Sequence, residues 1–264
     1  MKKLIVNTIG KGDINLILLH GWVLNSKIWY PIINILKEKC TLYLIDLPGY
    51  GKNYKYQYIN FKDIIYSIYT NIPKNSILMG WSLGGLIAQK IIFDYPDDIL
   101  GIITVSSSPC FLKKKNWPGV TEHLFKKYYH DIKKNYFNTI KNFLVIHTKL
   151  GNSKDTINNL IDMMMLDSKP DELALKYGLD LLIYTDLRNQ LIKSNLPFLR
   201  IYGKLDNIVP YDIKNILDQT WPNTYSVTLM HSAHVPFISQ SQQFCNIILK
   251  FFDFFKKKIN KFSL

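Results

Sequence analysis

The alternation of short apolar runs with amphipathic stretches most constrains the fold of this 264-residue sequence. Seven runs are predicted strands, and several are apolar at nearly every position, which is typical of parallel strands covered on both faces. These runs span residues 4–8, 15–20, 41–46, 76–80, 101–106, 197–203 and 225–230. Helical patterns lie at residues 26–38, 61–72, 83–95, 211–219 and 240–258. Together they predict an α/β fold with a doubly wound, mainly parallel sheet.

The alternation breaks between about residues 112 and 186, where we find only helical patterns. They lie at roughly residues 120–148, 154–166 and 170–184. Helices inserted between two groups of strands indicate a cap over the sheet rather than a second independent domain. We therefore predict an α/β core of residues 1–112 and 186–264, with a helical cap (lid) insertion over residues 113–185.

The composition, 47% hydrophobic and 20% charged, is typical of a soluble globular protein. We find neither the apolar core of a signal peptide nor the ~18 apolar residues that a membrane span needs, so we expect a cytoplasmic protein that does not engage a membrane. Cys40, Cys110 and Cys245 are widely spaced, which favours buried, reduced thiols over disulfides or a metal site.

The net charge of +13 raises the possibility of a nucleic-acid partner. Only two of the 33 basic residues are arginine, and no nucleic-acid-binding motif accompanies them, so we expect no nucleic-acid partner. The charge is concentrated at residues 113–150, where nine lysines face only Glu122 and Asp131. A basic surface of this kind attracts an acidic partner.

Residues 80–84, GWSLG, fit the pattern G-x-S-x-G between a predicted strand and a predicted helix. In such an elbow the serine adopts a strained backbone conformation and needs small neighbours to avoid clashes. We predict Ser82 as a nucleophile, and the alternative is an ordinary strand-to-helix turn.

A serine nucleophile needs a base that takes its proton. His231 and His234 follow the last predicted strand, where a loop can bring an imidazole over the edge of the sheet. We predict His234 as the base, because a histidine directly after a strand, such as His231, is more often structural or solvent-facing. The other histidines are expected to support a loop (His20) or to lie on the surface or in the cap (His123, His130 and His147).

The base needs an acid that orients it. Asp206 follows the predicted strand 197–203, in a loop at the carboxyl end where open α/β sheets place their chemistry. Asp186, near the cap boundary, and Asp212, on the following helix, are the rivals. The order Ser82, Asp206, His234 is the order of the α/β-hydrolases.

The oxyanion of an acyl-transfer reaction needs hydrogen-bond donors. Leu83 N–H opens the predicted helix, and Gly21 allows the loop before Trp22 to approach a ligand closely. We predict the N–H groups of Trp22 and Leu83 as the two donors, and the alternative for Trp22 is a packed aromatic residue. The sequence contains no metal or nucleotide motif, so we expect no cofactor.

Six segments together resemble one esterase family within the α/β-hydrolases, the pimeloyl-[acyl-carrier protein] methyl ester esterases of biotin synthesis. The segments are LLHGWVLNSKIW, YLIDLPGYG, GWSLGGLIAQ, VSSSPCF followed by WPGV, PFLRIYGKLDNIVP and SAHVPFIS. The resemblance implies a carboxylesterase that releases methanol from a pimeloyl methyl ester on an acyl carrier protein. It implies catalytic roles for Ser82, Asp206 and His234, and oxyanion or substrate contacts for Trp22, Leu83 and Phe143.

The resemblance also implies an acidic carrier protein docked on the cap, and we expect the enzyme to be a monomer. Arginines serve this purpose in the family, whereas this chain has Asn138 and Asn142 there, with Lys133, Lys134 and Lys141 nearby. Lysine supplies attraction but not bidentate geometry.

Two other functions remain compatible with the sequence. A broad-specificity carboxylesterase, or another serine hydrolase of the same fold, would carry the same three residues, because specificity resides in the cap. A binding module without catalysis is disfavoured, because all three residues are present.

Overall fold

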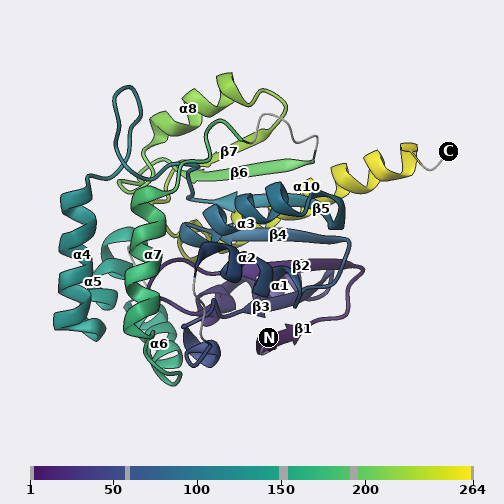
Figure 1. Ribbon diagram of the computed structural model, residues 1–264. Helices are drawn as coiled ribbons and strands as arrows, with labels where there is room; N and C mark the ends of the chain where they lie inside the picture. Colours follow the sequence, from purple (N-terminus) through teal and green to yellow (C-terminus); the bar gives the residue numbers. More distant parts are fainter. Residues whose placement is uncertain (1–2, 57–59, 149–153, 191–195, 263–264) are drawn as a thin grey trace.

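The computed structural model describes residues 3–56, 60–148, 154–190 and 196–262 and contains one seven-stranded sheet (Figure 1). Its spatial order is β1-β3-β2-β4-β5-β6-β7. The strands are β1 Val6–Ile9, β2 Ile14–Leu19, β3 Cys40–Ile45, β4 Ser76–Trp81, β5 Ile99–Val105, β6 Phe198–Gly203 and β7 Tyr225–Leu229. Only the β1–β3 pair is antiparallel, which confirms the predicted mainly parallel sheet.

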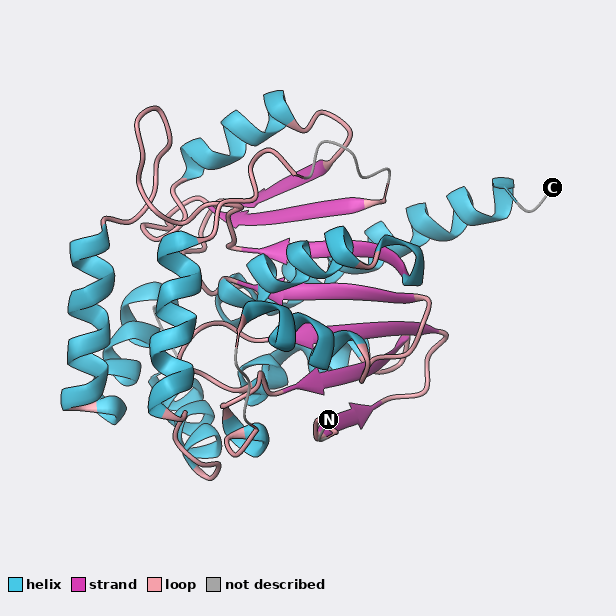
Figure 2. Ribbon diagram, in the orientation of Figure 1, coloured by secondary structure: helices cyan, strands magenta, loops and turns pink. Residues whose placement is uncertain are grey.

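Helices cover both faces of this sheet (Figure 2). The α-helices are α1 Tyr30–Leu36, α2 Phe61–Tyr69, α3 Leu83–Asp94, α4 Glu122–Lys134, α5 Tyr136–Thr148, α6 Lys154–Met165, α7 Glu172–Tyr184, α8 Tyr211–Thr220, α9 Pro236–Ser239 and α10 Ser241–Phe262. Short 3-10 helices lie at η1 Ser26–Trp29, η2 Gly51–Asn53 and η3 Pro96–Asp98. None of the described helices is both long and apolar enough to cross a membrane.

Connection handedness explains how the helices divide between the two faces. The chain moves from β2 to β3 in one direction along the sheet, and from β3 through β4 to β5 in the other. Because such crossovers are right-handed, α1 lies on the opposite face from α2 and α3. Helix α10 packs against α1, and α2 packs against α3.

The strands at the centre of the sheet are almost completely buried from solvent. Every residue of β4 and β6 is buried, as are Leu16 to Leu19 of β2. Both faces of these parallel strands are covered, which explains why their sequences are nearly continuous apolar runs. The cysteines at positions 40, 110 and 245 are buried and form no disulfide with one another, as predicted.

Four helices, α4 to α7, lie between β5 and β6 and are called the inserted helices below. They stand beyond the carboxyl ends of the parallel strands, at the left of Figures 1 and 2. The helical pattern predicted over residues 120–148 forms two helices rather than one, because α4 ends at Lys134 and α5 begins at Tyr136. Asn135 leaves the helical conformation, and its side-chain oxygen accepts a hydrogen bond from Asn138 N–H. Lys149, one of the nine predicted lysines, lies outside the described residues.

Candidate active site

Ser82 occupies a tight turn between β4 and α3. Its φ of 53° and ψ of −117° lie in a region that non-glycine residues rarely adopt. Hydrogen bonds hold the turn on both sides. Ser82 N–H donates to Val105 O (3.0 Å), and Ser82 O accepts from Ser107 Oγ (2.8 Å) and from the N–H groups of Gly85 (3.0 Å) and Leu86 (3.2 Å). The structure therefore contains the strained strand–turn–helix that G-x-S-x-G predicts.

The two glycines of the motif are required by the close approach of backbone. A Cβ atom at Gly80 would clash with the carbonyl oxygen of Gly84, and one at Gly84 would clash with that of Leu19. Each contact involves main-chain atoms that cannot move aside as a flexible side chain can. The elbow therefore accepts no side chain at either position.

His234 and Asp206 form a buried pair. The imidazole Nδ1 lies 2.8 Å from Asp206 Oδ2, and each side chain is only 1% exposed. The other carboxylate oxygen, Asp206 Oδ1, accepts from the N–H groups of Ile208 (2.8 Å) and Val209 (3.0 Å). Because the backbone holds the carboxylate, the carboxylate in turn can fix the orientation and tautomer of the imidazole.

Ser82 and His234 line one apolar cavity between the sheet edge and the inserted helices. Trp22, Val23, Trp81 and Phe111 contribute its wall on the side of the sheet, and helices α4, α5 and α7 supply most of the remainder. Phe143 of α5 lines the cavity, and its ring stands edge-on to the imidazole of His234, with centroids 6.1 Å apart. The arrangement presents a hydroxyl and an imidazole to an apolar substrate chain.

The backbone N–H groups of Trp22 and Leu83 have no hydrogen-bond acceptor among the residues that the structure describes. Leu83 is the first residue of α3, where the helix itself offers its N–H no acceptor. Leu83 lines a separate apolar pocket with Leu47 and Pro48 and is not among the residues that line the cavity of Ser82 and His234. The Trp22 indole lines the cavity and donates to Leu175 O of α7 (2.9 Å).

The comparison with family models decides the family. The model of the alpha/beta hydrolase fold matches residues 14–241. The chain is an α/β-hydrolase.

Curated relatives place this α/β-hydrolase more narrowly. It is 39% identical over 259 residues to the pimeloyl-[acyl-carrier protein] methyl ester esterase of Yersinia pseudotuberculosis serotype IB (strain PB1/+), covering 97% of this chain and all of that protein. It is 39% identical over 254 residues to the esterase of the same name from Hamiltonella defensa, covering 96% of this chain and 98% of that one. The chain therefore belongs to the esterase family that its motifs indicate.

Solved structures share the fold at much lower identity. An esterase from Exiguobacterium antarcticum superposes with a TM-score of 0.81 at 20% identity, over 93% of this chain and 94% of that chain. A bromoperoxidase from Bacillus anthracis gives 0.82 at 19% identity, over 94% of each chain. These likenesses show the α/β-hydrolase fold.

The predicted alternatives to His234 lie elsewhere in this α/β-hydrolase. His231 is exposed, as are His123 and His130. Of the two positions predicted for His147, surface or cap, the surface is wrong: this residue of the inserted helix α5 is buried, and its ring centroid lies 6.1 Å from that of His234. The sequence could not indicate this, since α5 reaches the sheet edge only through the packing of the inserted helices.

Trp81 is a site residue that the sequence did not single out. Its indole N–H donates to the carbonyl oxygen of His234 (2.8 Å), and the two rings pack with centroids 5.4 Å apart. The residue before the nucleophile thus supports the loop of the predicted base. Its place in G-x-S-x-G was the only available signal, and that pattern leaves the position open.

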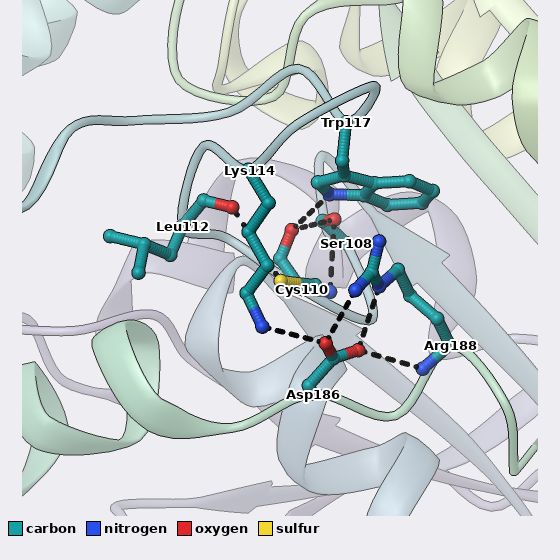
Figure 3. Close-up of polar contacts among 7 residues, drawn as sticks. All are labelled: Ser108, Cys110, Leu112, Lys114, Trp117, Asp186 and Arg188. Carbon is teal, nitrogen blue, oxygen red and sulfur yellow. Dashed lines mark hydrogen bonds and ion pairs between the residues drawn. The ribbon is translucent and has the colours of Figure 1, made fainter.

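Asp186, a predicted rival of Asp206, belongs to a different cluster (Figure 3). Its carboxylate accepts from Arg188 Nε (2.8 Å), Arg188 Nη2 (2.7 Å) and Lys114 Nζ (2.8 Å). Arg188 holds the pKa of this carboxyl well below its usual range. The second rival, Asp212, is exposed on α8. Neither aspartate contacts His234.

The same cluster contains Cys110, whose backbone pairs with that of Asp186 in a single antiparallel β-bridge outside the sheet. The carbonyl oxygen of Cys110 accepts from Trp117 Nε1 (2.8 Å) and Ser108 Oγ (2.6 Å). Its thiol donates toward Leu112 O (3.5 Å), and burial raises its pKa. The cluster joins the two connections between the sheet and the inserted helices, and the thiol is unsuited to nucleophilic chemistry.

Proposed function

We propose that this protein is a serine carboxylesterase that hydrolyses the methyl ester of a pimeloyl chain carried by an acyl carrier protein. The chemistry is carried by one arrangement: Ser82 in a strained elbow, beside the His234–Asp206 pair, in one apolar cavity. The substrate is supported by the 39% identity to esterases of that name over 97% of the chain.

The first half of the reaction forms an acyl-enzyme. Ser82 Oγ attacks the ester carbonyl while His234 Nε2 takes the hydroxyl proton, and Asp206 stabilises the imidazolium that results. The carbonyl oxygen becomes an oxyanion, which accepts from the N–H groups of Trp22 and Leu83. The tetrahedral intermediate breaks its bond to the methoxy oxygen, and His234 returns the proton, so that methanol leaves.

The second half regenerates the serine. Water attacks the acyl-enzyme carbonyl as His234 takes one of its protons. The second tetrahedral intermediate breaks the Ser82 Oγ–carbon bond, and the proton returns to Oγ. The products are the free carboxylate and the starting enzyme, and water is the only co-substrate.

The inserted helices act as the cap that distinguishes this substrate. Their apolar side chains, including Phe143, enclose the pimeloyl chain. An open groove, lined by Lys127 and Lys134 of α4 and by Asn142 and Ile146 of α5, shares Tyr128, Thr139 and Phe143 with the catalytic cavity. A polar arm from a carrier protein could therefore approach the cavity along the groove.

An acidic carrier is attracted by positive charge, which Lys134 supplies in the groove, because the other lysine there, Lys127, pairs with Asp131 of the same lining (3.1 Å). Lys133 pairs with Glu172 of α7, whereas Lys134 and Lys141 form no ion pair among the described residues. We therefore assign carrier docking mainly to Lys134 and Lys141.

The test compares methanol release from the carrier-bound pimeloyl methyl ester and from the free methyl ester, with wild type and Ser82→Ala. We expect wild type to prefer the carrier-bound ester, and Ser82→Ala to lose both activities by roughly 10⁴-fold or more. Equal kcat/KM on both esters would favour the broad-specificity carboxylesterase. Activity that survives Ser82→Ala would overturn the mechanism.

A further inference from the structure

His20, the residue after β2, is fully buried and makes two hydrogen bonds. Its Nδ1 lies 2.7 Å from Gly21 O, and its Nε2 lies 2.9 Å from the backbone nitrogen of Leu47. Because a backbone N–H can only donate, Nε2 must be the acceptor. The hydrogen then resides on Nδ1, which donates to Gly21 O, so one neutral tautomer satisfies both contacts.

The environment of the imidazole favours this neutral form. The pKa of His20 is lowered, because burial disfavours the charged imidazolium. The nearby Asp46 carboxylate and the hydrogen bond to Gly21 O act in the opposite direction but are outweighed. Asp46 is itself occupied, since its Oδ1 accepts from Ser26 N–H (2.7 Å) and its Oδ2 from Lys52 N–H (2.8 Å). His20 therefore has no role in taking a proton from substrate.

The carbonyl that His20 holds belongs to the peptide unit that carries Trp22 N–H. No described peptide bond is cis, so the Gly21 carbonyl and the Trp22 N–H point in opposite directions. A hydrogen bond that fixes the direction of the Gly21 carbonyl therefore also fixes the Trp22 N–H, which points to the opposite side of the peptide. This N–H has no acceptor among the described residues.

The Gly21–Trp22 peptide lies directly beside the elbow. A Cβ atom built on Gly21 would lie 2.7 Å from Trp81 Cε3 and 3.3 Å from Ser82 Cβ. The loop is under strain at the next residue, since Val23 has a φ of 66°, and Tyr136 Oη donates to Val23 O (2.8 Å). A strained loop keeps its conformation only while such contacts hold it.

We infer that His20 is a positioning residue for the oxyanion hole: its Nδ1–H holds the Gly21 carbonyl so that Trp22 N–H faces the carbonyl oxygen of the ester, whose carbon Ser82 attacks. The inference rests on the proposed esterase function. His20 acts through the peptide and does not touch the substrate.

Two substitutions separate the two hydrogen bonds of His20. In His20→Asn the amide nitrogen replaces Nδ1 and keeps the bond to Gly21 O, but the acceptor for Leu47 N–H is lost. In His20→Gln the amide oxygen replaces Nε2 and keeps the Leu47 bond, but the donor to Gly21 O is lost. The two variants are therefore matched controls for each other.

The test measures kcat and KM on a small soluble ester, the inhibition constant of a trifluoromethyl ketone that forms a tetrahedral adduct, and Tm. Loss of a whole oxyanion donor costs about 10²–10³ in kcat. We expect His20→Gln to lower kcat by roughly 10- to 100-fold with KM within about twofold, because the donor is misdirected rather than removed. The affinity of His20→Gln for the trifluoromethyl ketone should fall by the same factor as its kcat. His20→Asn should keep kcat within about threefold while its Tm falls, because Leu47 N–H is left buried without an acceptor.

The outcomes distinguish this inference from the proposed function. Equal kcat losses in both variants, in step with Tm, would show that His20 only packs, and an unchanged kcat in His20→Gln would equally overturn the inference. Both results require an active wild type. A wild type that hydrolyses neither the small ester nor the carrier-bound ester would overturn the proposed function first, and the inference with it.

Discussion

The indole N–H of Trp81 donates a hydrogen bond of 2.8 Å to the carbonyl oxygen of His234, across 153 positions of sequence. Trp81 directly precedes the proposed nucleophile, so one side chain connects the elbow to the loop of the proposed base. The relative position of Ser82 and His234 thus depends on a buried contact in which neither of their side chains takes part.

We predict that Trp81→Phe weakens both catalysis and folding. The change keeps an aromatic ring but leaves the buried His234 carbonyl without its donor, which costs about 1–3 kcal/mol in the free energy of unfolding. Displacement of the imidazole should lower kcat by roughly tenfold, because proton transfer depends closely on geometry. Urea unfolding and steady-state kinetics on a small ester measure the two effects.

Trp29→Phe is the matched control. Trp29 is also buried and packs on Phe237, as Trp81 does, but its indole N–H has no partner among the described atoms. The control removes the same volume without removing a hydrogen bond, so kcat should stay near wild type. An equal loss of kcat in both variants would assign the effect to packing.

A second prediction concerns the strain at Ser82. Both Ser82→Gly and Ser82→Ala delete the hydroxyl and should be inactive, but only glycine adopts a φ of 53° without steric cost. We expect the glycine variant to be the more stable by about 1 kcal/mol. Thermal or chemical unfolding of the two purified variants gives this difference.

Ser67 is a buried residue within α2, and here we expect the alanine variant to be the more stable one. At a helical position glycine is less favourable than alanine by about 1 kcal/mol. Ser67→Gly should therefore be less stable than Ser67→Ala. If alanine is also preferred at position 82, the elbow is not strained in solution.

The Asp186 cluster predicts a dependence of stability on pH. Because Arg188 and Lys114 lower the folded-state pKa of this carboxyl, its stabilisation is present above the unfolded value of about 3.9 and is lost as pH falls toward the folded value. Asp186→Asn should lower the free energy of unfolding at pH 7 by about 1 kcal/mol, since the group is partly exposed. The difference from wild type should shrink below about pH 4.

Guanidinium unfolding at pH 7 and pH 3 checks this expectation, with Asp212→Asn as control. Asp212 is exposed and forms no ion pair within the described part of the chain. Its variant should follow the wild type at both pH values. A constant deficit for Asp186→Asn across the range would show that the carboxylate charge does not stabilise the cluster.

The last prediction tests carrier docking. Lys134→Glu and Lys141→Glu should each raise KM for the carrier-bound ester by roughly tenfold at low salt and leave the free ester unchanged, because charge steers association and is screened by salt. Lys133→Glu should have a smaller effect on KM, since Lys133 already pairs with Glu172. Lys11→Glu, in the loop before the amino end of β2, is the distant control. Equal losses on both esters would exclude a docking role.

Much of the fold was predictable because short segments of the sequence specify its strands and the elbow. Near-continuous apolar runs encode strands buried on both faces, and the observed β2 to β7 lie within a residue or two of the predicted ranges. The G-x-S-x-G pattern requires only five adjacent residues to form the elbow at Ser82. Asp206 and His234 each follow the end of a strand, and this alone predicted that they lie at one edge of the sheet. In the structure they form a hydrogen bond there.

The sequence by itself thus determined the sheet, the elbow and the strand ends from which the proposed catalytic groups come. Only the tertiary structure decided that Asp206, and not Asp186 or Asp212, contacts His234, and that His147 is buried beside it. It also decided that Trp81 donates to the backbone of the proposed base and that Lys133 pairs with Glu172. The physical reason is that backbone periodicity reports which side of an element is buried, whereas these contacts join distant segments whose meeting depends on how the inserted helices and loops pack over the sheet.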